Sequence, residues 1–449
     1  MRFSVIILTS LLLVGLLQAA PKPNIVLILS DDQAWTDYSF MGHEHIETPH
    51  LDKLTTRSAV FTRGYVPTGL CRPSLMTLAT GLYAHQHKIS GNDPSPSLYP
   101  PKSEKNNQLR AELISNIDKN PTIARLLGEQ GYLSHQSGKW WEGNYKRGGF
   151  THGMTRGFPQ KGGRHGDDGL KIGREGMEPV FEFIDHSVEE EKPFYLWYAP
   201  FLPHTPHNPP KELFEKYKAK VDSPFVARYY AMCEWFDQTC GQLIDYLDEK
   251  GQTENTLIVY ICDNGWIQSE NKGGYAPRSK QSCNEGGVRQ PTMYSWPGKI
   301  VPGDRGDQLA SSIDIVPTML AAAGLKAPET MPGIDILPIL KSGEATPRKE
   351  VFGEGFAHDI ADVDKPDESL LYRWIVDGKW KLILTYDGLV GRYKSTHPRT
   401  EKRPQLYDLK ADPHEMKNLA ADNPDVVARL AGKIENWYPT ERKTLTSWE

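Results

Sequence analysis

Continuous apolar runs, rather than alternating ones, predict the main strands of this chain. Residues 24–30 (NIVLILS), 194–199 (FYLWYA) and 256–262 (TLIVYIC) are short and almost wholly apolar, and each is followed by polar or proline-rich sequence. A strand buried on both faces, as in a parallel sheet covered by helices, has this pattern. The segment 132–137 leads into Gly-Lys-Trp at 138–140.

Helical segments alternate with these strands. We expect helices at 122–130, 225–250 and 313–323, because their apolar positions follow helical spacing and each segment is followed at once by a glycine that can end a helix. Strands that alternate with helices in this way indicate a doubly wound α/β fold. The expected architecture is a large mixed sheet flanked by helices.

The pattern changes after about residue 345. Residues 372–376 and 380–385, joined through a short Asp-Gly turn, predict a β-hairpin. Residues 405–409 are a candidate third strand, and 424–437 is an amphipathic helix. We expect a small C-terminal antiparallel sheet with one helix.

The chain has 449 residues, which is long for one hydrophobic core. The predicted division is a signal peptide at 1–20, an N-terminal α/β catalytic domain at 21–345 and a smaller C-terminal α+β subdomain at 346–449.

The N-terminus indicates export. Arg2 precedes an apolar run over 6–17 and two small residues, Ala19 and Ala20, which together have the form of a secretory signal peptide. The run is too short for a membrane span, so no stable membrane insertion is expected. The sequence has no Asn-x-Ser/Thr acceptor with x other than proline, which favours a bacterial periplasmic or extracellular protein over a glycosylated eukaryotic one.

Charge and cysteine content narrow the classes further. The formal net charge is −5 and no basic stripe stands out, so we expect no nucleic-acid partner. Five cysteines cannot form a disulfide framework, and the odd number leaves at least one unpaired. Cys233 and Cys240 are seven positions apart on a predicted helix, too far to bond each other, and with Cys262 they are expected in the core.

Polar clusters follow three of the predicted strands, at Asp31-Asp32, at His204 to His207 and at Asp263-Asn264. The carboxyl ends of parallel strands are where open α/β sheets carry their functional groups. Carboxylate and amide oxygens are ligands for Ca²⁺ or Mg²⁺. A single Asp pair often only caps a following helix, but two such pairs favour a metal site.

Cys71 begins the segment Cys-Arg-Pro-Ser-Leu-Met-Thr-Leu-Ala-Thr-Gly over 71–81. This segment resembles the signature of the type I, arylsulfatase-like sulfatases of the alkaline phosphatase superfamily, Cys-x-Pro-Ser-Arg-x-x-Leu-x-Thr-Gly. The resemblance extends over about residues 22–440. Its other motifs, in family order, are Asp31-Asp32, Gly-Lys-Trp at 138–140, Pro-His-Thr-Pro-His at 203–207, Asp-Asn-Gly at 263–265, Lys280 with Glu-Gly-Gly at 285–287, and an Asp-x-x-Pro-Thr helix within 313–324.

The resemblance implies a sulfuric ester hydrolase whose cysteine is converted to formylglycine by a maturation enzyme. The hydrated aldehyde at position 71 would attack sulfur and displace the alcohol. The residues implied to hold a cation are Asp31, Asp32, Cys71, Asp263 and Asn264. The cation is expected to be Ca²⁺ rather than Mg²⁺. Lys139 and Lys280 would bind sulfate oxygens, and His204 would donate a proton to the leaving alcohol.

Two positions depart from the family pattern. Leu75 stands where the signature has an arginine that helps the maturation enzyme and orders the modified residue, and Trp141 stands where a sulfate-contacting histidine usually follows Gly-Lys-Trp. These departures leave open a catalytically weak relative with unmodified Cys71. A phosphate or phosphonate ester hydrolase of the same superfamily is the other alternative.

The substrate is expected to be a sulfated carbohydrate, because the candidate specificity loops combine histidine, asparagine and carboxylates with aromatic residues. The candidate substrate-binding residues are Asn92, Asp93, His165, His207 and His358.

Overall fold

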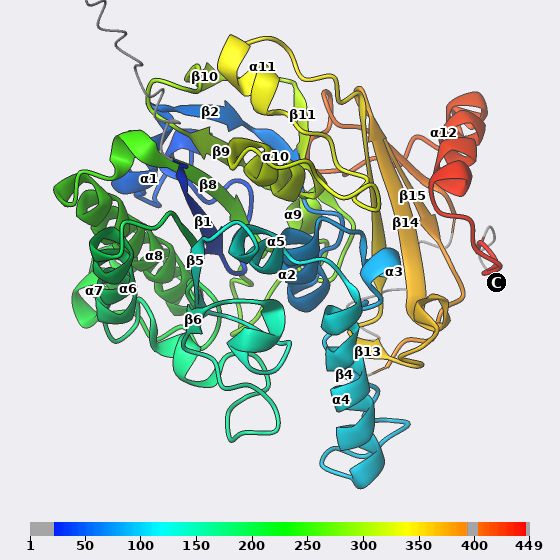
Figure 1. The fold of residues 1–449 in the computed structure, drawn as a ribbon. Coiled ribbons are helices and arrows are strands. Elements are labelled where there is room, and N and C mark those ends of the chain that lie inside the picture. Colours follow the sequence, from blue (N-terminus) through cyan, green and yellow to red (C-terminus); the bar gives the residue numbers. More distant parts are fainter. Residues whose placement is uncertain (1–21, 392, 394–402, 446–449) are drawn as a thin grey trace, which may run out of the picture.

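The computed structural model describes residues 22–391, 393 and 403–445, so the predicted signal peptide at 1–20 lies outside the described residues. A mixed sheet of eight strands forms the centre of the molecule (Figure 1). Its order is β10 (Gly303–Asp304), β2 (Ser58–Phe61), β9 (Thr292–Ser295), β8 (Thr256–Cys262), β1 (Asn24–Ser30), β7 (Phe194–Ala199), β5 (Leu133–Gly138) and β6 (His152–Gly153).

The three expected strands, together with β5, form the inner part of this sheet. β8, β1, β7 and β5 are neighbours and run parallel. Every residue of β1, β7 and β8 is buried, as their continuous apolar sequences predict. β9 lies antiparallel to both β8 and β2, which makes the sheet mixed.

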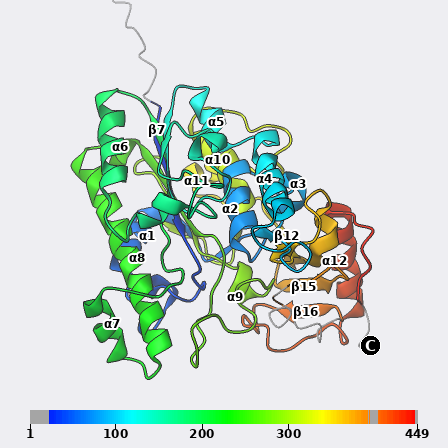
Figure 2. The same cartoon turned by 90° about the horizontal axis from the view of Figure 1, so that it is seen from below.

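Helices cover both faces of the sheet (Figures 1 and 2). Ile25, Leu27 and Leu29 of β1 belong to one hydrophobic core, whereas Val26 and Ile28 belong to the other. The first core includes α2 (Cys71–Thr80), α5 (Ile123–Gly128) and α10 (Ile315–Ala322); the second includes α1 (Pro49–Thr55), α6 (Glu178–Glu189) and α8 (Pro224–Glu249). The alternation along β1 therefore confirms the predicted doubly wound fold.

The expected helices differ from the observed ones at their ends. The segment 122–130 is helical only over Ile123–Gly128. The segment 313–323 is a 3-10 turn at Ser312–Asp314 followed by α10. The helix α4 (Glu104–Lys119) was not expected, because its sequence is dominated by polar residues.

The second sheet has four antiparallel strands in the order β12 (Glu350–Phe356), β14 (Leu370–Asp377), β15 (Trp380–Thr385) and β16 (Gln405–Asp408). The helix α12 (Pro424–Trp437) packs on it through Leu430 and Ile434 (Figure 2). This confirms the predicted small sheet with one helix. Trp374 of β14 donates a hydrogen bond to the carbonyl of Pro67, in the loop before α2, at 3.2 Å, so the second sheet contacts the N-terminal part of the chain and the boundary at residue 345 stays a prediction.

None of the helices in the described part of the chain combines the length and the apolar character that a membrane span needs.

Candidate active site

The parallel strands deliver polar side chains to one edge of the sheet. Asp31 and Asp32 follow β1, Asp263 and Asn264 follow β8, and Lys139 follows β5. Because β5, β7, β1 and β8 are consecutive neighbours, these side chains converge. Asp32 has φ of 65°, in the left-handed region that non-glycine residues seldom adopt, which is typical of a functional position.

Two buried lysines form ion pairs with Asp31 and Asp32. Lys139 Nζ lies 2.7 Å from Asp31 Oδ1, and Lys280 Nζ lies 2.6 Å from both carboxylate oxygens of Asp32. Burial lowers the pKa of Lys280, but Asp32 and the neighbouring acidic groups outweigh it and raise that pKa well above its ordinary value. Both ammonium groups are therefore charged at neutral pH.

Three buried oxygens of this cluster have no hydrogen-bond partner among the described residues, namely Asp31 Oδ2, Asp263 Oδ2 and Asn264 Oδ1. Burial, opposed by Lys139, raises the pKa of both Asp31 and Asp263. Unpaired buried acceptors of this kind are costly unless something binds them. Carboxylate and amide oxygens are the ligand types that Ca²⁺ and Mg²⁺ take, so the chemistry of the donor set fits the cation that the sequence predicts.

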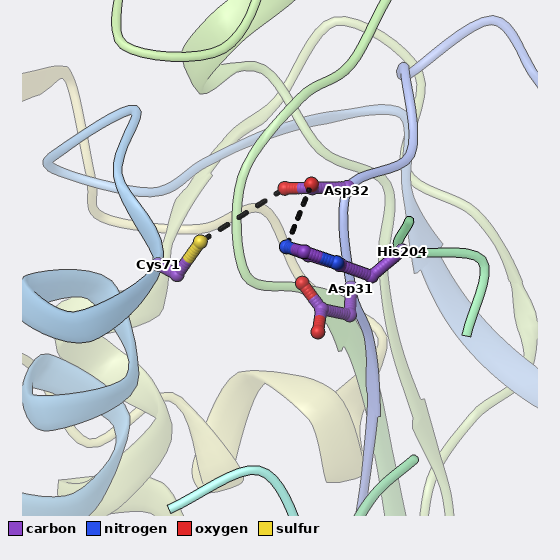
Figure 3. Close-up of side chains that lie close together, drawn as sticks. All are labelled: Asp31, Asp32, Cys71 and His204. Carbon is purple, nitrogen blue, oxygen red and sulfur yellow. Dashed lines mark hydrogen bonds and ion pairs between the residues drawn. The ribbon is translucent and has the colours of Figure 1, made fainter. Parts of the chain in front are cut away.

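Cys71 and His204 complete the cluster (Figure 3). Cys71 is the first residue of α2, and its Sγ lies 4.0 Å from Asp32 Oδ1. His204 Nε2 lies 3.3 Å from Asp32 Oδ2 and 3.5 Å from Lys280 Nζ. Ligand atoms of Asp31, Asp32, Cys71 and His204 all lie within 4.8 Å of one another.

The Cys71 thiol is a poor nucleophile in this position. Its side chain is buried, and burial, opposed by Lys139 and Lys280, raises its pKa to about 11. The thiol is therefore protonated at neutral pH, whereas thiol reactivity requires the thiolate. All five cysteines are free and buried, which agrees with the expected core placement of Cys233, Cys240 and Cys262.

A cavity of about 230 Å³ opens onto this cluster. Of the predicted substrate-binding residues, Asn92, His165 and His358 line it. Asp93 and His207 are not among the lining residues: Asp93 is held by two arginines, and the His207 ring packs 5.4 Å from that of Tyr229. The remaining lining residues are Cys71, Lys139, Trp141, Arg164, His204, Thr205, Trp266, Tyr275, Lys280, Gln281 and Tyr393.

The structure shows what surrounds Leu75 and Trp141, the two positions that depart from the family pattern. Leu75 is buried in the first hydrophobic core, so an arginine there would need a buried partner for its charge. Arg72 lies next to the nucleophile position instead, and Glu142 accepts its Nε and Nη2 hydrogen bonds, both at 2.7 Å. Trp141 lines the cavity, and the His165 ring lies 5.1 Å from it, so this wall keeps a histidine.

Three residues at or near the site were not predicted from the sequence: Arg72, Glu142 and Arg164. Arg72 stands beside Cys71, and Glu142 follows the Gly-Lys-Trp-Trp segment, so proximity to the motifs was the available signal. Arg164 lies in a glycine-rich loop where no periodicity points to a role.

The site combines carboxylate and amide oxygens at strand ends, two charged lysines and a cysteine at the start of a helix. The chain belongs to the sulfatase family: the family profile named Sulfatase matches residues 23–325, and that of the N-sulphoglucosamine sulphohydrolase C-terminal region matches 277–438.

Relatives and solved structures agree with this assignment. The chain is 27% identical to N-acetylgalactosamine-6-sulfatase of Canis lupus familiaris, over 95% of this chain and 88% of the relative. It is 28% identical to arylsulfatase A of Homo sapiens, over 93% of this chain and 87% of the relative. The named relatives are sulfuric ester hydrolases, and the chain is an enzyme of this class.

Two solved structures show the same fold. Ps i-CgsB in complex with k-i-k-neocarrahexaose has a TM-score of 0.71 at 24% identity. The match covers 93% of this chain and 92% of that one. The phosphonate monoester hydrolase of Agrobacterium radiobacter has a TM-score of 0.65 at 20% identity, with 92% of this chain and 95% of that one covered.

Proposed function

We propose that this sulfatase removes sulfate from a sulfated carbohydrate, using a formylglycine formed from Cys71 and a bound Ca²⁺ ion. The observation that carries the proposal is the set of three buried oxygens without a hydrogen-bond partner among the described residues, on Asp31, Asp263 and Asn264, next to the ion pairs that Lys139 and Lys280 form with Asp31 and Asp32.

Asp31, Asp32, Asp263 and Asn264 would hold the cation, together with the modified residue 71. A bound divalent cation supplies Lewis-acid stabilisation of charge on the sulfate oxygens and on the nucleophile. Asp31 and Asp263 share one lysine as their counterion. Lys139 Nζ lies 2.7 Å from Asp31 Oδ1 and 3.7 Å from Asp263 Oδ2. The three carboxylates exceed the two lysines by one charge, which favours a cation at this point.

Lys139 and Lys280 would bind the sulfate group of the substrate. Both line the cavity, and each ammonium group has three N–H donors, more than its aspartate partner uses. Charged donors fixed by buried carboxylates are aimed before the substrate arrives, which is the condition for stabilising charge in the transition state.

Cys71 needs conversion to act. Its thiol is protonated at neutral pH, whereas a hydrated formylglycine offers a hydroxyl group as the nucleophile. The maturation enzyme is therefore a required partner in this proposal.

His204 is the proposed proton donor to the leaving alcohol. Its Nδ1 lies 2.6 Å from the Thr205 carbonyl, which accepts a hydrogen bond from that nitrogen and leaves Nε2 facing the cluster. Burial, together with Lys139 and Lys280, lowers the pKa of His204 well below its ordinary value. A sulfate ester bound to the two lysines brings negative charge that opposes this effect and favours the protonated ring.

A sulfated carbohydrate in the periplasm or outside the cell is the proposed setting. Neutral hydrogen-bonding groups, including Asn92 and Gln281, line the cavity beside the cations, and they match the hydroxyl groups of a sugar. Several relatives and neighbouring structures carry names or ligands of sulfated sugars. The predicted signal peptide supports export.

The experiment compares a sulfate ester, a phosphate monoester and a phosphonate monoester of the same alcohol, using protein matured in the presence of a formylglycine-generating enzyme. We expect the highest kcat/KM for the sulfate, and loss of that activity in Cys71→Ala. A large preference for the phosphate or phosphonate would instead favour the hydrolase type represented by the Agrobacterium structure. Full activity in Cys71→Ala would contradict the nucleophile.

A further inference from the structure

We infer that Arg164 forms a second anion-binding site within the active-site cavity, so the substrate carries a carboxylate or a second sulfate close to the sulfate that is removed. This inference rests on the proposed function for the identity of the first anion. The site itself rests on the geometry of Arg164, which lines the same cavity as Cys71, Lys139 and Lys280.

Arg164 is held in one orientation on two sides. Asp93 accepts hydrogen bonds from Nε, at 3.2 Å and 3.1 Å to its two oxygens, and also from Nη2. The Trp141 ring lies under the guanidinium, with Cζ 4.5 Å from the ring centroid. A planar guanidinium fixed by a carboxylate and an aromatic face loses little freedom when it binds a further anion.

One edge of this guanidinium stays available. Nη1 has a single contact among the described residues, a long one of 3.5 Å to His165 Nδ1. Burial, together with Arg164, lowers the pKa of His165 to about 3, so the ring is neutral and does not repel an anion. The Arg164 side chain is 42% exposed, which leaves this edge open to a ligand in the cavity.

Asp93 does not neutralise the site, because it serves two arginines. Arg110 Nη1 lies 2.7 Å from Asp93 Oδ1, and its side chain is largely buried behind the carboxylate. Two guanidinium groups against one carboxylate leave one positive charge, and only Arg164 presents it to the cavity. The next carboxylate on this wall, Asp359, is fully buried and lies 2.8 Å from His358 Nδ1.

Arg72, a second arginine of the described residues near the cavity, does not offer a comparable site. Arg72 is fully paired with buried Glu142 and also donates to the Asn92 carbonyl at 3.0 Å. The cavity therefore has two positive regions, the lysine pair for the scissile sulfate and Arg164 for another anion. Since its volume is only about 230 Å³, the second anion belongs to the same sugar ring or to the ring linked directly to it.

The test uses three disaccharides that share one scissile sulfate: a neutral monosulfated one, one with a second sulfate, and one with a uronic acid carboxylate. For each we measure kcat/KM and take the ratio of the two-anion to the one-anion substrate. Wild type should prefer at least one two-anion substrate, and Arg164→Gln should reduce that ratio about 10- to 100-fold, the effect of one charge-assisted contact. The substrate that loses most identifies the second anion as sulfate or carboxylate.

Arg156→Gln is the matched control, because Arg156 is an exposed arginine close by in the chain that pairs with Asp168 at 3.1 Å and does not line the cavity. It should leave the ratio unchanged, and Arg164→Lys should recover part of it. A wild-type ratio near one, or a ratio unaffected by Arg164→Gln, would overturn the inference.

Calorimetric binding of the same saccharides to Cys71→Ala, with and without Arg164→Gln, separates this inference from the proposed function. If wild type hydrolyses none of the sulfates, the proposed function fails. The second anion site still stands if the two-anion saccharides bind at least 10-fold more weakly without Arg164, and it falls if they do not.

Discussion

Asn264 donates a hydrogen bond from its Nδ2 to Asp32 Oδ1 at 2.7 Å, and this contact fixes the orientation of the Asn264 amide. The opposite orientation would place two acceptor oxygens against each other. The Asn264 Oδ1 atom is therefore left without a hydrogen-bond partner among the described residues, as are Asp31 Oδ2 and Asp263 Oδ2. The hydrogen bond to the Asp32 carboxylate thus leaves the neutral amide oxygen of Asn264 available as a ligand for the proposed cation.

Replacing this amide should weaken cation binding. Asn264→Ala removes one oxygen ligand and one hydrogen bond, so we expect the Ca²⁺ dissociation constant to rise at least about 10-fold. Isothermal titration of metal-free protein with Ca²⁺ measures it. Asn107→Ala, on the exposed face of α4, is the control and should bind as wild type does. Equal affinity in Asn264→Ala would exclude Asn264 as a ligand.

Cation binding should weaken in acid. Burial raises the pKa of Asp31 and of Asp263, so protons compete with the cation for these oxygens at a higher pH than for ordinary aspartates. The Ca²⁺ dissociation constant should therefore increase as the pH is lowered from neutral toward the ordinary aspartate pKa of about 4, and binding should release protons into the buffer. Titrations in two buffers of different ionisation enthalpy measure both effects. Affinity that is constant over this range would contradict the role of the two aspartates.

The ion pair of Arg72 and Glu142 should be important for stability. Both side chains are at most 1% exposed, so Glu142→Gln would leave a buried guanidinium without its counterion beside the first turn of α2. We expect the free energy of unfolding to fall by about 3 kcal/mol, as measured by denaturant titration. Asp118→Asn is the comparison, because it breaks an exposed pair with Arg147 and should cost less than about 1 kcal/mol. Equal losses in the two variants would show that burial of the Arg72 pair has no special effect.

The Asp93 carboxylate should stabilise the protein in a pH-dependent way. Burial alone would raise its pKa, but Arg164 and Arg110 outweigh burial and hold that pKa well below its ordinary value. A lowered pKa in the folded state contributes stability above the unfolded pKa of about 4, and that contribution falls as the pH drops below it. Asp93→Asn should therefore be less stable than wild type at pH 7, with a difference that shrinks below pH 4. Thermal unfolding of both proteins across this pH range measures the difference. A difference in stability that stays constant with pH would contradict the pairing of Asp93 with the two arginines.

The strand-end residues could be predicted because they follow directly from the fold. Continuous apolar runs identified the parallel strands, and the polar residues after them had to meet at one edge. β9 was missed because it is a four-residue antiparallel strand with no pattern of its own. The functions of loop residues were harder to predict, since partners far apart in sequence determine them. Asp93, a predicted substrate contact, is paired with Arg164 and Arg110, and no sequence pattern indicated that pairing or that Arg164 lines the cavity.

The central claim is that a formylglycine at position 71 is the nucleophile of a sulfate ester hydrolase. The most direct measurement is the rate of sulfate release by protein preparations in which peptide mass spectrometry gives the fraction of residue 71 converted from thiol to aldehyde. Preparations with different fractions come from expression with varying amounts of a maturation enzyme. We predict a rate of sulfate release proportional to the converted fraction, with no release by protein that retains the thiol. Sulfate release that is independent of conversion would contradict it.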